Sequence, residues 1–337
     1  MTTAEPRNPV PVDATPGPIY IDTQHEDMVH DAQMDYYGSK LATCSSDRTI
    51  KIYNVSENAY ELSATIQGGH EGPVWQVSWA HPKFGVLLAS CSFDGSVLLH
   101  REVRPREWTV IHAARHLHES SVNGVAFAPH EHGLLVAAAS SDGRVSVLQH
   151  EAANNTWGVH YLADCPLGVN AVSWAPWGAF YQADQVEAPR LVTAGCDNQI
   201  RFWIYKEGQW TTDSSIVLDV SEVAHKDWVR DVAWSPVLLP NHNMVASCSE
   251  DGSVIVWTQV PPANVDGDDT IQESVSQWKP TLLHKYDTPV WRVSWSLTGH
   301  LLAVSAGDSD VTLWKAGLDG AWSQVSTVDA QPTSQGQ

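Results

Sequence analysis

The sequence predicts an all-β fold, a β-propeller of six blades, and three observations support this prediction. The segment Leu88–Val97 returns almost unchanged at Val245–Val254, and four looser copies occur elsewhere in the chain. A run of alternating apolar residues precedes each copy, and a further, mostly bulky residue follows each copy at a constant distance. Repeats of about 40–50 residues made of short strands and turns are typical of propellers, in which one repeat forms one four-stranded blade.

Each copy of the repeated segment ends in a turn that contains an aspartate. The six aspartates lie 47 to 57 residues apart, at Asp47, Asp94, Asp142, Asp197, Asp251 and Asp308. Six positions after each aspartate stand Tyr53, His100, Leu148, Trp203, Trp257 and Trp314. We therefore expect the aspartate to close the turn between the second and third strands of every blade.

The run before each copy has the period of two that indicates a half-buried strand. The six runs are Val29–Asp35, Val74–Trp79, Val122–Phe127, Val169–Trp174, Val229–Trp234 and Val290–Trp295. They are predicted to be the inner strands. The propeller is then expected over 19–328, with blades near 28–66, 73–113, 121–163, 168–219, 228–284 and 289–328.

The polar residues of the fifth repeat match the hydrogen-bond tetrad of WD repeats. The tetrad is predicted to be His225, Ser247, Asp251 and Trp257, because buried polar groups must find partners between the strands. His25, His70 and His118 stand at the histidine position of the first three repeats. Cys165 and Tyr286 stand there in the fourth and sixth repeats, so looser networks are expected in those blades.

Composition excludes several classes of function. The net charge of −20 disfavours binding to nucleic acid through its phosphates. No apolar run approaches the roughly 20 residues that span a bilayer, and the first residues lack the apolar core of a signal peptide. The five cysteines are odd in number and form no C-x-x-C pair, which argues against disulfides and zinc ribbons.

No pattern of residues predicts an enzyme. The common nucleophile, phosphate-binding, dinucleotide and zinc-protease motifs are absent. The pairs His116/His118 and His130/His132 have a spacing that could chelate a metal, but a structural histidine and a turn explain them better. Asp266 to Asp269 resemble a calcium loop without its final glutamate. The chain is therefore expected to have no catalytic residues, cofactor or metal.

The joint between blade six and blade one, which we call the seam, is predicted to be open. The chain contains no seventh repeat, and neither end is left over to latch the ring. Unpaired edges and exposed apolar faces invite strands from another chain. The predicted seam residues are Met28, His30, Ala32, Met34, Val290, Arg292 and Ser294. A disordered tail is expected at 1–18 and a C-terminal tail at 329–337, with solvated insertions at 178–189 and 261–279.

Longer strings in the sequence resemble one particular family of WD-repeat proteins. His30-Asp31-Ala32 leading to Asp35-Tyr36-Tyr37-Gly38 resembles the first blade of the Sec-thirteen family. Gly69 to Gly85, Asp227 to Pro236 and Trp291 to Gly299 resemble its second, fifth and sixth blades. The resemblance covers about 24–322, nearly the whole predicted propeller.

The resemblance implies a non-catalytic scaffold whose open ring receives a blade from a partner chain. The implied partners are the large COPII coat subunit of the Sec-thirty-one type, in endoplasmic reticulum to Golgi transport, and an α-solenoid nucleoporin of the nuclear pore Y-shaped complex. The vacuole-associated SEA complex is a further implied partner. The implied locations are the cytoplasmic face of the endoplasmic reticulum membrane and COPII vesicles, the nuclear pore and the vacuole membrane. Membrane association is expected to be peripheral and indirect.

Two alternatives stay open at the level of sequence. One is the related open pore propeller of the Seh-one type, although the Asp-Tyr-Tyr-Gly and His-Pro-Lys-Phe-Gly words favour the Sec-thirteen type. The other is a seven-bladed adaptor that binds peptides on its end face.

Three tryptophans, Trp75, Trp228 and Trp291, lie at or beside the starts of inner strands, where they serve either core packing or partner contact.

Overall fold

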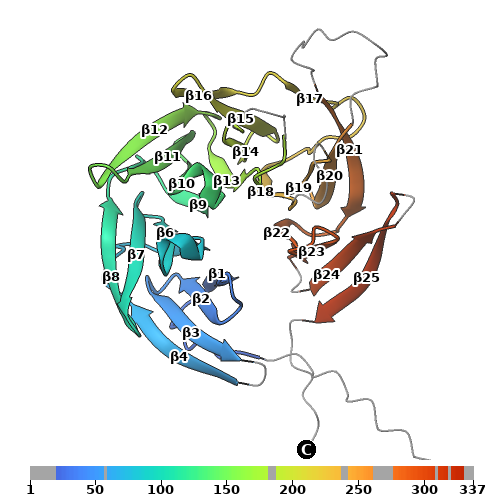
Figure 1. Ribbon diagram of the computed structural model, residues 1–337. Coiled ribbons are helices and arrows are strands. Elements are labelled where there is room, and N and C mark those ends of the chain that lie inside the picture. The colour runs from blue at the N-terminus through green and yellow to red at the C-terminus, as the bar shows by residue number, and fades with distance from the viewer. Residues whose placement is uncertain are drawn as a thin grey trace, which may run out of the picture.

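The described strands form six sheets arranged in a ring (Figure 1). The structure is a computed structural model that describes residues 20–56, 59–180, 187–236, 242–260, 276–307, 310–317 and 320–329. Each sheet consists almost entirely of consecutive strands, ordered from the ring centre outward. This confirms the prediction of a six-bladed, all-β propeller, and no described sheet combines strands from the two ends of the chain.

The first three blades contain four antiparallel strands each. Blade one contains β1 (Val29–Met34), β2 (Lys40–Ser45), β3 (Ile50–Ser56) and β4 (Ala59–Ile66). Blade two contains β5 (Val74–Trp79), β6 (Leu87–Ser92), β7 (Val97–Arg104) and β8 (Glu107–Ala114). Blade three contains β9 (Val122–Phe127), β10 (Leu135–Ser140), β11 (Arg144–Glu151) and β12 (Thr156–Ala163).

The last three blades follow the same plan, with one addition. Blade four contains β13 (Val169–Trp174), β14 (Arg190–Gly195), β15 (Ile200–Lys206) and β16 (Gln209–Thr212). Blade five contains β18 (Val229–Trp234), β19 (Met244–Ser249), β20 (Ser253–Gln259), β21 (Ser276–Lys285) and β17 (Ile216–Leu218). Blade six contains β22 (Val290–Trp295), β23 (Leu301–Ala306), β24 (Asp310–Ala316) and β25 (Trp322–Asp329).

The aspartate turns form because the carboxylate accepts main-chain hydrogen bonds two residues ahead. Asp94 accepts from Ser96 N at 2.9 Å, and Asp142 accepts from Arg144 N at 3.0 Å. Gly95 follows the aspartate with φ +79°, and a Cβ there would lie 2.7 Å from the carbonyl oxygen of His118. Both the left-handed backbone and this close approach require glycine.

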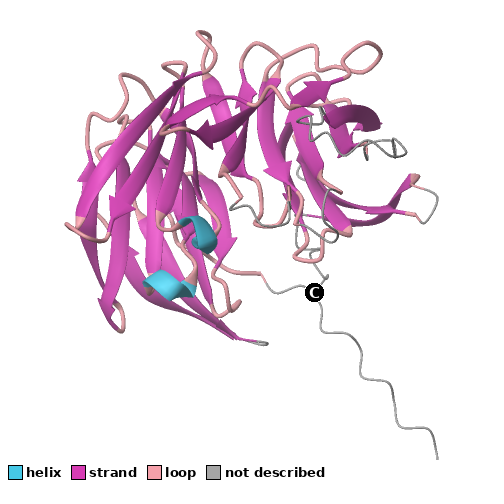
Figure 2. Ribbon diagram, turned by 45° about the horizontal axis from the view of Figure 1, so that its top comes forward, coloured by secondary structure: helices cyan, strands magenta, loops and turns pink. Residues whose placement is uncertain are grey.

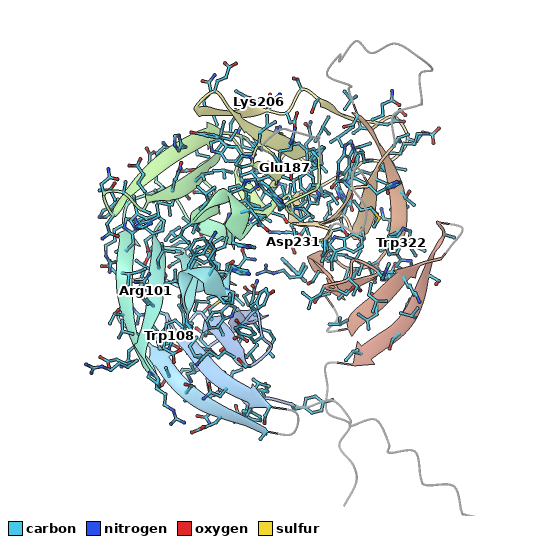
Figure 3. The ribbon with its side chains drawn as sticks, viewed as in Figure 1. Arg101, Trp108, Glu187, Lys206, Asp231 and Trp322 are labelled. Carbon is cyan, nitrogen blue, oxygen red and sulfur yellow. The ribbon has the colours of Figure 1, made fainter. Side chains whose placement is uncertain are left out.

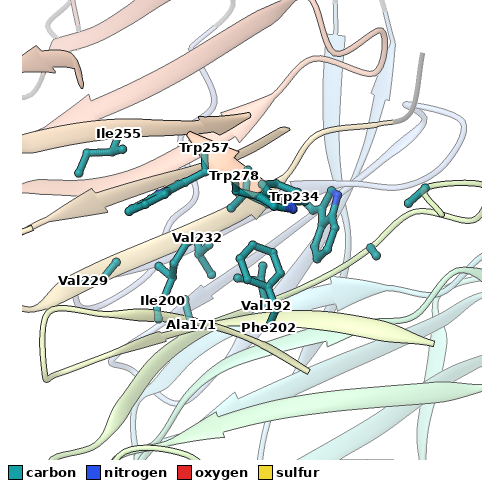
Figure 4. Close-up of a cluster of buried hydrophobic side chains, with 14 residues drawn as sticks. Ala171, Val192, Ile200, Phe202, Val229, Val232, Trp234, Ile255, Trp257 and Trp278 are labelled. Atoms are coloured by element: carbon teal, nitrogen blue, oxygen red, sulfur yellow. The ribbon is translucent and has the colours of Figure 1, made fainter. Parts of the chain in front are cut away.

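The hydrophobic core lies between neighbouring blades rather than inside one of them. Five clusters of buried side chains fill the joints from blades one and two to blades five and six. Figure 4 shows the cluster between blades four and five, where Trp234 and Trp278 lie against Phe202. No buried cluster of the described residues spans the seam.

Some predicted boundaries differ from the structure, and some predicted segments lie outside the described residues. β17, predicted within blade four, pairs in parallel with β21 at the outer edge of blade five. The last four residues of the predicted loop at 261–279 belong to β21. The predicted C-terminal tail at 329–337 begins one residue too early, because Asp329 belongs to β25. The rest of that tail, the predicted tail at 1–18, and residues 181–186 and 261–275 of the two insertions lie outside the described residues.

In the residues that the structure describes, helical structure is confined to two short 3-10 turns. They are η1 (Pro82–Phe84) and η2 (His130–His132), which follow the inner strands of blades two and three (Figure 2). The described part of the chain holds no helix with the length and apolarity needed to cross a membrane.

Candidate partner-binding seam

The predicted tetrad forms in blade five, with one additional member. His225 bonds Ser247 Oγ and Ser253 Oγ, both at 2.7 Å, and Trp257 Nε1 donates to Ser247 at 2.9 Å. Asp251 accepts from the backbone N–H of Ser253 at 2.7 Å. The serine therefore stands between the histidine ring and the carboxylate. In blades one to three the histidines contact the aspartates directly, at distances of 2.7, 3.3 and 3.0 Å.

Blades four and six do not have the looser networks that were expected. In blade four, Asp164 accepts hydrogen bonds from Thr193 Oγ1 and from Trp203 Nε1, and it pairs with Arg201. In blade six, the Tyr286 hydroxyl lies 2.5 Å from Thr312 Oγ1 and accepts from Trp314 Nε1 at 3.0 Å. The expectation was wrong because it counted histidines, whereas any well-placed polar group can satisfy these buried atoms.

Hydrogen bonds tie each inner strand to the next one at the five closed joints. The side chain of the third residue in an inner strand often accepts from the main-chain N–H of the fourth residue in the next inner strand. Asp31 accepts in this way from Val77, Gln76 from Val125, and Asp231 from Val293. The indole N–H of the sixth residue in an inner strand often donates to the main-chain carbonyl of the fifth residue in the preceding inner strand. Trp79 donates in this way to Gln33, Trp174 to Ala126, and Trp295 to Ala233. At the joint between blades four and five, Asn170 donates to the carbonyl of Val229 and Ser173 accepts from Trp234 N.

The seam lacks the residues that could make the two recurring ties. Arg292 occupies the third position of β22, and a guanidinium has donors but no acceptor. Met34 occupies the sixth position of β1, where an indole N–H stands in four of the other five blades. Neither of the two recurring ties can therefore form between blade six and blade one.

One ion pair crosses the seam in the described structure. Arg292 Nη2 lies 3.7 Å from Asp31 Oδ1. Asp231, which Figure 3 places toward the middle of the ring, is the other carboxylate near this guanidinium. Burial raises the pKa of Asp231 to about 6, although the positive charge of Arg292 opposes the rise. The guanidinium thus stands between two carboxylates, one on each neighbouring blade.

Blade one presents to the seam a face that every other blade buries. The first residue of the inner strand is a fully buried valine in five blades, at Val74, Val122, Val169, Val229 and Val290. In blade one the equivalent Val29 is 43% exposed. Ala32 is also exposed, and Met34 is 47% exposed. These three residues lack the preceding blade that would cover them.

Blade six presents the complementary face. Ala303 on β23 pairs with Ser294, and its equivalents in the other blades are fully buried: Ala42, Ala89, Ala137, Val192 and Ala246. Ala303 itself is half-buried, as is Ser305 two residues later. Burial in β23 alternates between buried and half-buried residues, whereas the second strands of blades two and three are buried on both faces.

The structure divides the predicted seam residues into two groups. Ala32, Met34, Arg292 and Ser294 lie on the two open faces, and Met28 precedes β1 with 68% exposure. His30 instead packs edge-on against Trp75 of blade two, with ring centroids 4.4 Å apart. Val290 is fully buried against blade five. These two placements differ from the prediction because a β-bulge interrupts the alternation after the first residue of each of these two strands.

The segment before β1 covers part of the open face of blade one. The Thr23 carbonyl accepts from the Tyr53 hydroxyl at 2.5 Å and from Lys51 Nζ at 3.2 Å. His25 bonds Thr43 Oγ1 at 2.9 Å. The residues that stay open are therefore those near the ring axis, Val29, Ala32 and Met34.

Other kinds of site were sought in the described residues. All five cysteines are free and buried, and three of them, Cys44, Cys91 and Cys248, occupy the same position opposite the inner-strand bulge. No group of three or more metal-ligating side chains occurs in the described ranges. At the end of the ring opposite the tetrads, Tyr36, His81, His130 and Trp177 line a shallow cavity of about 1130 Å³.

Comparison with known proteins agrees with the repeat pattern. The family model described as "WD domain, G-beta repeat" matches residues 17–54, 61–101, 112–147, 158–203, 219–258 and 280–315. The chain is 44% identical over 313 residues to "Protein SEC13 homolog" of Drosophila melanogaster, covering 90% of this chain and 82% of that protein.

Two fungal relatives are similar over nearly their whole length. "Protein transport protein SEC13" of Mycosarcoma maydis is 40% identical over 354 residues, covering 93% of this chain and 95% of the relative. "Protein transport protein sec13" of Emericella nidulans is 43% identical over 318 residues, covering 90% and 96%. With six matched repeats and this identity over most of the chain, the protein belongs to the Sec13 (Sec-thirteen) family of WD-repeat propellers.

Proposed function

We propose that this chain is a non-catalytic scaffold subunit in protein transport, and that a partner chain inserts strands at the seam. Relatives that are named protein transport proteins support the first part. One observation supports the second part: Val29 is exposed and Ala303 is only half-buried, although the equivalent positions are fully buried in the other five blades. A sheet placed between blades six and one would bury both faces.

The open faces define the chemistry of the inserted strands. Small or apolar side chains line both sides, namely Val29, Ala32 and Met34 on blade one and Ala303 with Leu313 on blade six. The joint between blades one and two, which neighbours the seam, packs Ala42 and Cys44 against Val74 and Val77. A partner strand with branched apolar residues on both faces would reproduce such a joint on each side.

The family resemblance supplies candidate partners for this face. They are the large COPII coat subunit of the Sec-thirty-one type, an α-solenoid nucleoporin of the Y-shaped complex and the vacuole-associated SEA complex. The chain would then act at endoplasmic reticulum membranes and COPII vesicles, at the nuclear pore and at the vacuole membrane. We expect contact with membranes and RNA to be made by the assemblies, since the net charge of −20 disfavours direct binding to anionic surfaces.

Co-expression of the full chain with a fragment of each candidate partner tests the proposal. Ala303→Glu places a charge on the open face and is expected to abolish co-purification, because insertion would bury an unpaired carboxylate. Ala113→Glu is the matched control, because Ala113 is an exposed alanine on the outer strand of blade two.

Equal co-purification of both variants would contradict insertion at the seam. A structure of the complex that shows the partner elsewhere and the seam empty would contradict it as well. The pattern of binding across the three fragments distinguishes the coat, pore and vacuole assignments.

A further inference from the structure

Two exposed tryptophans hold an arginine between them at one end of the ring. The Arg230 guanidinium carbon lies 5.2 Å from the centroid of the Trp228 ring and 4.9 Å from that of the Trp291 ring. Arg230 Nε also donates to Glu250 at 2.5 Å. Although both rings contact the guanidinium, each tryptophan remains 46% exposed. The rings are thus held in place while a large apolar area stays open to solvent.

Further aromatic side chains lie at the same end of the ring. Trp75 donates from Nε1 to Ser121 Oγ at 2.9 Å, its ring centroid lies 6.5 Å from that of Phe93, and Phe93 is 60% exposed. The sheet register places all of these residues at one end, because the start of each inner strand pairs with the end of its second strand. We call the surface formed by His30, Trp75, Phe93, Trp228 and Trp291 the aromatic face.

Carboxylates surround the aromatic face. The loops that lead into the inner strands carry exposed acidic residues in five of the six blades, at Glu26, Asp27, Glu71, Glu119, Asp227 and Asp287. The nearby cations are fewer and partly neutralised: Arg230 pairs with Glu250, and Arg144 pairs with Asp142. In the described residues of these loops and turns, Arg48, Arg115 and Lys226 add three exposed cations, and Arg115 donates to the carbonyl of Gly69. The border of the aromatic face formed by these loops, which we call the acidic rim, is therefore negatively charged.

We propose that the aromatic face binds a basic segment of a partner protein that also carries an apolar anchor residue. Exposed, pre-positioned indoles are the side chains that most often dominate binding energy at interfaces. The ring faces attract cationic side chains, and the acidic rim attracts the same charges at longer range. This surface lies on the end of the ring, with Trp228 and Trp291 on one side of the seam and His30, Trp75 and Phe93 on the other.

Fluorescence anisotropy with the full chain tests this proposal. The probe is a labelled synthetic peptide in which lysines and arginines flank a central leucine, and the comparison peptide replaces every basic residue with glutamate. The basic peptide is expected to bind saturably and to bind more weakly as salt is added, whereas the acidic peptide is expected not to bind.

Two double variants localise the binding. Trp228→Ser with Trp291→Ser removes the apolar anchor site, and Asp227→Lys with Asp287→Lys reverses part of the rim. Each is expected to weaken binding by about tenfold or more. The controls are Trp177→Ser, an exposed tryptophan at the opposite end, and Glu107→Lys on the outer strand of blade two. Both controls are expected to change binding by less than about twofold.

Three results would overturn the proposal. One is the absence of saturable binding by the basic peptide. Another is an equal loss in the control variants, which would show attraction to the net charge of the whole chain. The third is undiminished binding in the variant with both charges reversed, which remains informative even if the tryptophan variant fails to fold. None of these results depends on co-purification through the seam.

Discussion

At the residue scale, the buried polar network of blade five shows how single side chains stabilise the sheet. His225 is buried and bonds two serine hydroxyls, so its ring serves the network best in the neutral form. Burial lowers the pKa of His225 to about 4, although the negative charge of Asp251 opposes the shift. His100, which replaces the tryptophan of the tetrad in blade two, has a pKa lowered to about 3 by burial.

Removing the turn carboxylate in Asp251→Ala is expected to destabilise the chain. The carboxylate accepts from the backbone N–H groups of Lys226 at 2.6 Å and Ser253 at 2.7 Å, and the loss leaves both donors unsatisfied. The expected decrease in the free energy of unfolding is about 1–3 kcal/mol, measured by urea denaturation. Asp287→Ala, at an exposed position, is the control. Equal denaturation midpoints for the two variants would show that Asp251 does not stabilise the network.

The lowered pKa of His225 predicts a loss of stability in mild acid. Between about pH 6.5 and pH 4 the unfolded chain binds a proton at this residue and the folded chain does not, so the free energy of unfolding falls as the pH falls. In His225→Gln this proton is absent, and the decrease over the same range is expected to be smaller. Thermal unfolding midpoints of both proteins across this range provide the measurement. If the unfolding midpoints of both proteins fell equally with pH, the pKa of His225 would not be lowered by the fold.

At the element scale, the β-bulge in the inner strand decides which residues face which neighbour. A strict alternation places Val290 and Arg292 on one face, but the bulge between them places them on opposite faces. Val290 therefore contacts blade five while Arg292 contacts the seam. The same bulge separates Val29 from Asp31 in blade one.

Two equivalent alanines on second strands provide a direct test of the open face. Ala246 on β19 is fully buried at the joint between blades five and six, whereas Ala303 on β23 faces the seam. Ala246→Glu is expected to lower stability by several kcal/mol, since it buries an unpaired charge. Ala303→Glu is expected to cost less than about 1 kcal/mol in the isolated chain. Urea denaturation of the two purified variants compares them, and equal losses would mean that the seam is closed.

At the scale of the whole molecule, the described residues form five apolar joints between blades and one ion pair across the seam. The joints from blade one to blade six bury continuous clusters, and the seam has the Arg292–Asp31 pair. An ion pair with a partly exposed partner contributes little to stability. The ring can therefore separate at the seam at a small cost in free energy, which suits the proposed insertion of a partner.

Arg292→Gln is expected to loosen the seam without unfolding the blades. Loss of the guanidinium leaves Asp31 and Asp231 without the positive charge between them. Hydrogen exchange of the amides in β1 is expected to become roughly two- to fivefold faster, while exchange in β9 and β10 stays unchanged. Arg106→Gln, which removes an exposed ion pair with Glu61, is the control. Unchanged exchange in β1 would show that the pair does not hold the seam.

Local repetition in the sequence determined the number of blades, the order of their strands and most of the tetrads. These features depend on contacts within one repeat, and each repeat carries the necessary residues, such as Ser247, Asp251 and Trp257, at constant spacing. The open seam could also be inferred, because it depends on counting the repeats and assigning each blade its own strands.

The tertiary structure alone decided which side chains are open at the seam and what stands between its faces. Val29 and Ala303 look like their buried counterparts in every other repeat, so no local pattern marks them. Their exposure comes from the absence of a neighbouring blade, which is a property of the ring. The Arg292–Asp31 pair joins residues from opposite ends of the chain, and only closure of the ring brings them together.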